Sequence, residues 1–233
     1  MSDMFLRTKS LIGEDNLAKL KGSSVAVFGL GGVGSYAAEA LTRSGIGTLY
    51  IYDNDTVSQS NINRQLIALP STVGEKKTDL VKSRCLSVNP EIRIHDFCEF
   101  ITPESKIPFE KFDFIIDAVD NVTAKIFLAK NAQNKNIPII SVMGTGNKLH
   151  PEKLTISDIY KTYECPLCKV MRYELKKRGI KKLPVVWSDE TPKKPENLGE
   201  TKGSHPAPAS MVFVPATAGI TAASYAIRKL MEK

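Results

Sequence analysis

A glycine-rich turn between an apolar run and a helical pattern is the feature that most limits how this chain can fold. Residues 25–28 form a short apolar run, and from Val33 small apolar residues recur with helical spacing until Gly45. Runs of this length are typical of buried parallel strands, and glycines between such a strand and a helix let backbone N–H groups approach a phosphate. The pattern predicts a nucleotide-binding turn, unless the glycines serve packing alone, and its members are Gly29, Gly31, Gly32 and Gly34.

Strand-like and helix-like segments alternate through the first 142 residues. Apolar runs at 48–52, 112–117 and 138–142 predict further strands, and helical patterns cover 76–87 and 122–135. Alternation of this kind indicates a parallel sheet with helices on both faces. We therefore expect the α/β class, with a Rossmann-like, mostly parallel sheet covered by helices on each side.

The pattern changes after Met143. Residues 158–178 predict a short strand or turn followed by a basic helix. Residues 211–214 and 216–231 predict a strand and an alanine-rich helix that extend the fold at its C-terminal end. Between these parts, 188–210 combines prolines, lysines and glycines with few apolar residues, so we expect a mobile loop there. Residues 1–233 are expected to form a single domain that carries this loop.

The composition is that of an ordinary globular protein. No apolar run approaches the roughly 20 residues that a membrane helix needs. The first residues also lack the charged start, apolar stretch and cleavage site of a secretory signal. Four cysteines are too few and too scattered for a disulfide framework. We expect a cytoplasmic protein without membrane contact.

Two carboxylates follow the second predicted strand. Asp53 lies 24 positions after Gly29, where a carboxylate accepts hydrogen bonds from ribose hydroxyl groups. Asp55 either shares this role or is a solvated loop residue. A dehydrogenase would also place an acid here, so the carboxylates indicate a nucleotide without choosing between a redox dinucleotide and ATP.

The cations that come next favour ATP. Hydride transfer needs a flat nicotinamide pocket with little extra positive charge, whereas transfer at phosphorus needs cations on the phosphates. Arg64 can clamp phosphate oxygens in a bidentate manner, and Lys77 can act as a point charge. Asn61 and Gln65 add neutral donors beside them. The order of these residues therefore predicts an ATP site.

A further carboxylate follows the strand predicted to end at Asp117. Asp120 lies just beyond that strand, at the edge where open α/β sheets bind ligands. It is well placed to hold Mg²⁺ on a triphosphate, while Asp117 caps or orients the turn. Asn147 and Lys148, at the same edge, are weaker candidates for substrate contact.

Positive charge is concentrated in one short segment. The net charge of the chain is +7, and residues 169–182 alone contribute +6. Clustered cations suit a polyanion, because each neutralised phosphate releases counterions. The alternative is a solvated helix face with a charge bias. The cations are Lys169, Arg172, Lys176, Lys177, Arg178, Lys181 and Lys182.

Together these residues resemble the ATP-site signature of the ubiquitin-activating-enzyme-like superfamily, which includes the adenylating enzymes of molybdopterin and thiamine biosynthesis. The resemblance implies that ATP and Mg²⁺ are the cofactors and that the protein is a homodimer. Arg7 matches an arginine that a neighbouring protomer places on the ATP phosphates. The other matching positions are Asp53, Asn61, Asn63, Arg64, Gln65, Lys77, Asp120 and Asn121.

A narrower resemblance is to the tRNA threonylcarbamoyladenosine dehydratases. It is carried by residues 5–8, 31–40, 43–47 and 143–149, and it extends over 158–162 and 171–182. It implies an ATP-dependent cyclisation of the modified adenosine in tRNA through an acyl-adenylate, with the basic segment on the tRNA. A sulfur-transfer protein is a candidate partner. The implied catalytic residues are Arg7, Arg64, Lys77 and Asp120, of which Asp120 also holds the metal.

The cysteines bear on the alternative activity, which is adenylation of a ubiquitin-like sulfur-carrier protein. Relatives with that activity usually bind structural zinc through two Cys-x-x-Cys pairs. Here Cys165 and Cys168 form the single pair, and His205 is the one later candidate ligand, which leaves the four-ligand set incomplete. We therefore expect Cys165 to pack in the interior and Cys168 to lie on a helix surface without zinc.

Overall fold

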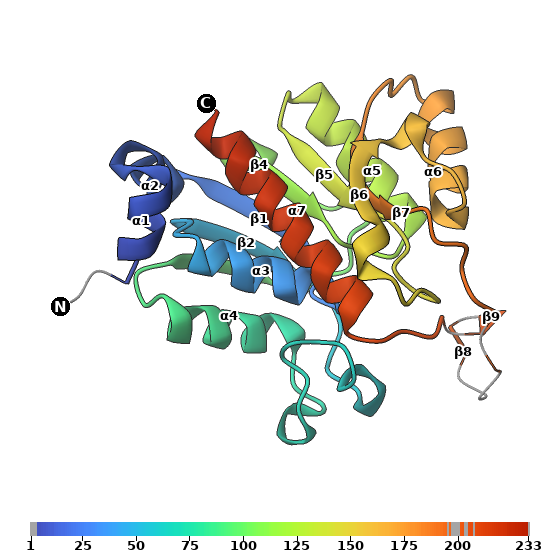
Figure 1. The fold of residues 1–233 in the computed structure, drawn as a ribbon, viewed down its shortest axis with the longest axis horizontal. Helices are drawn as coiled ribbons and strands as arrows, with labels where there is room; N and C mark the ends of the chain where they lie inside the picture. Colours follow the sequence, from blue (N-terminus) through green and yellow to red (C-terminus); the bar gives the residue numbers. More distant parts are fainter. Residues whose placement is uncertain (1–3, 195, 197–200, 203–204, 207, 233) are drawn as a thin grey trace.

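A seven-stranded sheet forms the centre of the protein (Figure 1). The computed structural model describes residues 4–194, 196, 201–202, 205–206 and 208–232. The strand order is β3-β2-β1-β4-β5-β7-β6, and all neighbouring strands are parallel except β6, which pairs antiparallel with β7. The strands are β1 (Ser24–Phe28), β2 (Thr48–Tyr52), β3 (Arg93–Phe97), β4 (Phe114–Asp117), β5 (Ile139–Val142), β6 (Leu154–Asp158) and β7 (Pro184–Ser188).

Helices cover both faces of the sheet, as the alternating pattern predicts (Figure 1). One face packs against α3 (Gly34–Arg43), α4 (Lys77–Val88) and α7 (Phe213–Met231), and the other against α5 (Val122–Asn134) and α6 (Pro166–Lys177). Two short helices, α1 (Leu6–Ile12) and α2 (Glu14–Gly22), precede β1. Single 3₁₀ turns occur at Gln59–Asn61, Pro70–Thr72, Phe109–Lys111, Pro151–Lys153 and Ile159–Lys161.

The two faces of the sheet bury two separate apolar cores. Strands β2, β4 and β5 are buried along their whole length, and β1 is buried except at its first residue. Because side chains of a strand alternate between faces, Val25 and Val27 join the core under α3 and α7, whereas Ala26 and Phe28 join the core under α5 and α6. Apolar side chains on both faces explain why these strands appear as continuous apolar runs in the sequence.

The strand predicted at 211–214 is wrong, because α7 already begins at Phe213. Val214, Ala218 and Ala222 recur with helical spacing and are all buried, so burial of this helical face outweighs the local β propensity. Pro215 is tolerated because it lies in the first turn, where its missing N–H has no partner to lose. The predicted C-terminal helix is therefore longer at its start than its alanine-rich pattern indicated.

The segment at 188–210 is only partly described. Ser188 is not in a loop, because it closes β7, and Thr201–Lys202 pairs with His205–Pro206 as strands β8 and β9 of a small antiparallel sheet. Residues 195, 197–200, 203–204 and 207 lie outside the described residues, and the predicted mobility of this loop remains a prediction. Over the part of the chain that the structure describes, no helix is long and apolar enough to cross a membrane.

Candidate functional site

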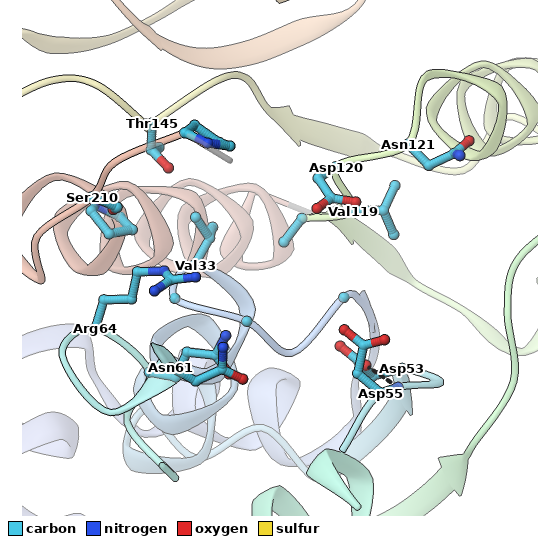
Figure 2. Close-up of a pocket in the computed structure, with 18 of the residues that line it drawn as sticks. Val33, Asp53, Asp55, Asn61, Arg64, Val119, Asp120, Asn121, Thr145 and Ser210 are labelled. Carbon is cyan, nitrogen blue, oxygen red and sulfur yellow. Dashed lines mark hydrogen bonds between the residues drawn. The ribbon is translucent and has the colours of Figure 1, made fainter. Parts of the chain in front are cut away.

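A cavity of about 1370 Å³ opens at the carboxyl ends of β1 and β4. These strands are the point where the strand order reverses, and ligands of open α/β sheets bind at such a point. Every residue predicted for the nucleotide site except Gly34 and Arg7 lines this cavity. In Figure 2, Asp53 and Asp55 approach it from one side, Asn61 and Arg64 from another, and Asp120 from the turn after β4.

The glycine turn after β1 is too tight for side chains at two positions. Gly29 has a φ of +84°, and a Cβ there would lie 2.7 Å from the carbonyl oxygen of Ala118. A Cβ on Gly34 would lie 1.7 Å from the carbonyl oxygen of Gly29. Gly34 therefore shapes the turn without facing the cavity, and Gly29, Gly31 and Gly32 present backbone to it.

Helix α7 supports this turn from behind, which the sequence did not predict. A Cβ on Gly219 would lie 2.2 Å from the carbonyl oxygen of Val33, so the two backbones touch. A Cβ on Gly32 would lie 3.3 Å from the Cβ of Pro215. The sequence indicates this contact only through the small residues of α7, because small side chains permit close helix packing.

Asp53 and Lys77 organise the side of the cavity formed by β2 and α4. Asp53 accepts hydrogen bonds from the backbone N–H groups of Leu30, at 2.6 Å, and Asp55, at 2.8 Å. Burial raises the pKa of the Asp53 carboxyl group, and the charge of Lys77 opposes this rise. The Lys77 side chain is only 6% exposed and forms an ion pair with Asp55 at 2.8 Å. Asp53 therefore fixes the glycine turn, and Lys77 supplies a cation at the cavity wall.

The segment 59–65 forms the opposite side of the cavity. Arg64 donates through Nη1 to the carbonyl oxygen of Ser60 at 2.6 Å and to the side-chain oxygen of Asn63 at 3.0 Å. The amide of Asn63 donates to the carbonyl oxygen of Ser210 at 2.8 Å. Asn61 accepts from the backbone N–H of Ser58 at 3.2 Å. These contacts hold Arg64 at the cavity while connecting Asn63 to the chain that leads into α7.

Two buried polar atoms in the cavity wall have no hydrogen-bond partner within the described residues. They are the hydroxyl oxygen of Tyr52 and the side-chain oxygen of Gln65. A buried polar atom without a partner is costly, so such atoms are expected to meet a ligand or water. Hydroxyl and amine groups of a nucleoside would satisfy both atoms.

A fully buried ion pair lies beneath the turn that carries Asp120. The Lys125 ammonium group contacts both carboxylate oxygens of Asp117 at 3.2 and 3.1 Å, the hydroxyl of Ser141 at 3.1 Å and the carbonyl oxygen of Val142 at 2.7 Å. Asp117 also accepts from the backbone N–H of Val119 at 3.2 Å. Asp117 thus orients the turn, as predicted, but Lys125 and Ser141 were missed because their partners are distant in sequence.

Of the other residues predicted at the carboxyl edge of the sheet, some line the cavity and one does not. Asp120 and Asn121 both line it, and Asn121 also caps α5 by accepting from the N–H of Ala124 at 3.0 Å. Asn147 lines it as well. Lys148 does not, because its side chain is 3% exposed and donates to the carbonyl oxygen of Ser188 at 2.9 Å. Lys148 therefore has a structural contact and not the suggested contact with substrate.

Arg7 lies far from the cavity of its own chain. It belongs to α1, is exposed, and follows Phe5, which packs against Gly45 just before the start of β2. The cavity lies at the other ends of the strands, and in Figure 1 α1 and α2 lie at the opposite end of the molecule from β7 and α6. Within one protomer Arg7 cannot reach a nucleotide in this cavity.

The cysteine pair is buried as a unit at the start of α6. Cys165 is 4% exposed and Cys168 is 0% exposed, so the expectation of a surface thiol at Cys168 was wrong. Cys168 lies on the same helical face as Met171 and Leu175, which pack on the sheet. The hydrogen bond that Cys168 donates lowers the pKa of Cys165.

No group of three or more metal-ligating side chains occurs among the described residues. Cys98, which directly follows β3, is exposed.

The fold and the cavity define a class of protein, an α/β nucleotide-binding protein with cations and a carboxylate gathered around the phosphate turn. Comparison with known proteins narrows this class. The model of the ThiF family matches residues 6–233, so the chain belongs to the ThiF family. This result confirms the superfamily inferred from the sequence.

Relatives of the same length share one name. The chain is 42% identical to the tRNA threonylcarbamoyladenosine dehydratase of Bacillus subtilis, over 100% of this chain and 96% of the relative. It is 34% identical to the Escherichia coli protein of that name, over 97% and 92%. The crystal structure of the E. coli enzyme in complex with ATP superposes with a TM-score of 0.89 at 32% identity, covering 98% of this chain and 94% of that one. These similarities confirm the predicted mostly parallel α/β fold.

Proposed function

We propose that this protein is an ATP-dependent dehydratase that cyclises threonylcarbamoyladenosine in tRNA. The observation that carries the proposal is the gathering of Arg64, Lys77 and Asp120 around the glycine turn of one cavity, in a chain whose full-length relatives bear the dehydratase name. The cavity has room for a nucleotide together with a modified nucleoside, since ligand pockets for single small molecules span about 300–1,000 Å³. We propose that residues 1–233 form one adenylating domain.

The chemistry requires two displacements. In the first, a carboxylate oxygen of the threonyl group attacks the α-phosphorus of ATP, and the bond to the β-phosphate breaks to release pyrophosphate. In the second, the ureido oxygen attacks the activated carbonyl carbon, the ureido N–H proton is lost, and AMP leaves with one of the former carboxylate oxygens. The modified adenosine loses one water overall. No protein nucleophile is needed, so the enzyme contributes positioning and charge stabilisation.

The residues of the cavity have distinct parts in this reaction. Gly31 and Gly32 offer backbone N–H groups to the phosphates at the start of α3, whereas Gly29 shapes the turn and donates its own N–H to the carbonyl oxygen of Tyr52 at 2.8 Å. Arg64 and Lys77 stabilise the charge that develops on the phosphate oxygens. Asp53 fixes the turn and faces the ribose, with Asp55 holding Lys77 in place. Further nucleotide contacts come from Asn61, Asn63, Gln65 and Asn121.

Magnesium fits the donor set at this edge. Mg²⁺ usually binds proteins through one or two carboxylates together with substrate phosphates, so a dedicated cluster of three ligands is not required. Asp120 is the carboxylate at the cavity that we assign to it. Bound there, the ion would neutralise charge on the triphosphate.

A second copy of the chain completes the site. Because Arg7 cannot reach the cavity of its own protomer, we propose a homodimer in which each Arg7 binds the phosphates in the partner's cavity. The side chains of Met4, Leu6 and Leu11, which lie on or next to α1, are 53%, 62% and 84% exposed. Exposed apolar side chains beside Arg7 are consistent with an interface at α1.

The basic segment 169–182 is assigned to the tRNA backbone. We further propose a cytoplasmic location, where tRNA and ATP are both present, and a sulfur-transfer protein as a partner of the enzyme. The full-length relatives favour the dehydratase over the adenylation of a sulfur carrier.

Mass spectrometry of nucleosides tests the function directly. Threonylcarbamoylated tRNA is incubated with the purified protein and Mg-ATP, then digested and analysed. The expected result is an ATP-dependent loss of one water from the modified adenosine. An unchanged nucleoside, together with pyrophosphate exchange that appears only when a carrier protein is added, would overturn the proposal.

A further inference from the structure

The exposed face of α6 carries an aromatic ring surrounded by lysines. Cys168, Met171 and Leu175 form the buried face of this helix. Tyr173 lies near the centre of the opposite face and is 67% exposed. Residues three and four positions apart are neighbours on a helix surface, so the helical neighbours of this ring are Lys169, Val170, Lys176 and Lys177, all exposed.

The cations of this segment divide into two groups. Arg172 donates to the backbone and side-chain oxygens of Thr162, and Arg178 forms an ion pair with Glu174. Both arginines are thus engaged within the protein. Lys169, Lys176 and Lys177 form no ion pair with a carboxylate of the described residues, so their charges face solvent around Tyr173. We name Lys169, Tyr173, Lys176 and Lys177 the α6 platform.

Helix α6, which carries the platform, begins beside the cavity. Leu167, in the first turn of α6, lines the cavity wall together with Gly144 and Thr145. At 1.5 Å per residue, Tyr173 lies about 9 Å further along the helix axis than Leu167. Because this axial separation is short, a polynucleotide with one nucleoside in the cavity can place an adjoining part of the same strand on α6.

Single-stranded RNA has the chemistry that fits this platform. Proteins bind unpaired bases by stacking them on aromatic side chains while cations follow the backbone phosphates. An enzyme that acts on a base inside a folded RNA must also take that nucleotide out of its stack, which leaves a neighbouring base with an open face. An exposed tyrosine among three lysines offers a ring to that base and charges to the phosphates on either side of it.

We propose that Tyr173 stacks on an unpaired base next to the modified adenosine, and that Lys169, Lys176 and Lys177 bind the adjoining phosphates. This inference rests on the proposed function, because it takes the tRNA as the occupant of the platform. The sequence had suggested only that the charge of this segment binds a polyanion. The proposal adds a residue that recognises an unpaired base. Tyr173 is a positioning residue, since it holds the tRNA and does not touch the reacting atoms.

Three variants separate stacking from charge. Tyr173→Phe keeps an aromatic face, Tyr173→Leu keeps an apolar side chain without one, and the double variant Lys169→Gln with Lys176→Gln removes two charges. Lys21→Gln, on α2 outside the cavity lining, is the matched lysine control. All these residues are exposed, so thermal unfolding should change little. The full-length proteins are titrated with threonylcarbamoylated tRNA over a range of salt concentrations.

The variants should differ in affinity and in salt dependence. Tyr173→Leu should weaken binding of the tRNA about tenfold, since base–aromatic stacking has this magnitude, and it should leave the salt dependence unchanged. Tyr173→Phe should bind like the wild type. The double lysine variant should lower the slope of log affinity against log salt by about two, one for each phosphate contact, whereas Lys21→Gln should not change it.

A fluorescent base analogue beside the modified adenosine gives a second signal. The wild type and Tyr173→Phe should quench it on binding, and Tyr173→Leu should not. Wild-type affinity and quenching in Tyr173→Leu would overturn the inference. So would a loss of affinity in Tyr173→Leu for an acidic protein partner with unchanged binding of tRNA. Failure of the proposed function would give a different result from failure of this inference. If the protein is not a dehydratase, the wild type will leave the modified adenosine of these samples without loss of water.

Discussion

Asn147 and Ala209 exchange two hydrogen bonds at the rim of the cavity. The backbone N–H of Asn147 donates to the carbonyl oxygen of Ala209 at 2.7 Å, and the N–H of Ala209 donates to the side-chain oxygen of Asn147 at 2.8 Å. The carbonyl oxygen of Asn147 also accepts from the N–H of Lys193 at 2.7 Å. One residue thus holds the two ends of the segment 193–209 together beside the nucleotide site.

Asn147→Gly should loosen this segment without disturbing the turn that carries it. Asn147 has a φ of +61°, which glycine adopts without strain, so the substitution removes mainly the side-chain acceptor. We expect limited proteolysis between residues 193 and 209 to become severalfold faster, because local opening costs less free energy. Asn147→Asp retains the acceptor oxygen and should be cleaved like the wild type. Equal cleavage of Asn147→Gly and wild type would show that the backbone bonds alone hold the segment.

Lys125→Met, on α5, should be among the most destabilising single substitutions in the protein. It removes the ammonium group from a pair in which both side chains are at most 1% exposed, and leaves Asp117 without its cation. Breaking a buried pair in this way costs about 3–5 kcal/mol of unfolding free energy, measured by denaturant titration. The double variant Lys125→Met with Asp117→Leu should recover part of this loss, since no charge is then left buried. A double variant as unstable as the single one would contradict this account.

The local signals in the sequence predicted most of the fold, and nearly all of the residues predicted for the nucleotide site line the cavity. Strands such as 48–52 are buried on both faces, so their apolar runs are visible without knowledge of the neighbours. The polar residues after them follow strand ends, and parallel strands bring their carboxyl ends to one edge. Asp53 and Asp120 could therefore be placed together from the order of elements alone.

What the sequence did not predict depends on contacts between distant segments. Helix α7 starts earlier than its alanine-rich pattern, and Val214 in its first turn is buried. Lys125 appeared to be an ordinary helix lysine, and only the position of Asp117 and Ser141 shows that it is buried. Cys168 was expected on a surface because the face that α6 turns to the sheet was unknown. In each case tertiary packing outweighed the local pattern.

Lys77→Met should destabilise the protein in a way that depends on pH. Burial raises the pKa of Asp53 above its value in the unfolded chain and Lys77 opposes this, so the substitution should raise the pKa of Asp53 further. When folding raises the pKa of a carboxyl group, the ionised group destabilises the folded protein at pH values above the folded-state pKa. This destabilisation is lost as the pH falls through the folded-state pKa and the group becomes protonated. The loss of unfolding free energy, about 1–3 kcal/mol at neutral pH, should therefore shrink in mildly acidic buffer.

Lys77→Arg keeps the charge beside Asp53 and should show little of this pH dependence. Unfolding by denaturant at several pH values measures the effect for both variants and the wild type. A loss in Lys77→Met that stays constant with pH would show that Asp53 does not sense the charge of Lys77.

Asp120→Ala should slow the first chemical step strongly while leaving the fold intact. The carboxylate lies at the cavity beyond β4, and the turn that carries it is held from below by Asp117. Loss of the proposed magnesium ligand should reduce formation of the adenylate by a factor of about 10²–10³, the range found when one stabilising group of a transition state is removed. Pyrophosphate release with threonylcarbamoylated tRNA measures this, and the thermal unfolding curve serves as the control. Release at the wild-type rate would refute the role assigned to Asp120.

Arg7→Ala should inactivate the enzyme in a manner that a second defective variant can rescue. Arg7 lies on α1 and does not line the cavity of its own protomer, so the proposed homodimer assigns it to the site of a partner copy. Arg7→Ala and Asp120→Ala homodimers should each be inactive. A heterodimer of the two contains one site with both an intact Asp120 and an Arg7 from the other chain. Dissociating and reassociating an equal mixture should therefore restore about a quarter of the wild-type dehydration rate, since half of the dimers are mixed and each has one working site. A mixture without activity would place Arg7 outside the partner's site.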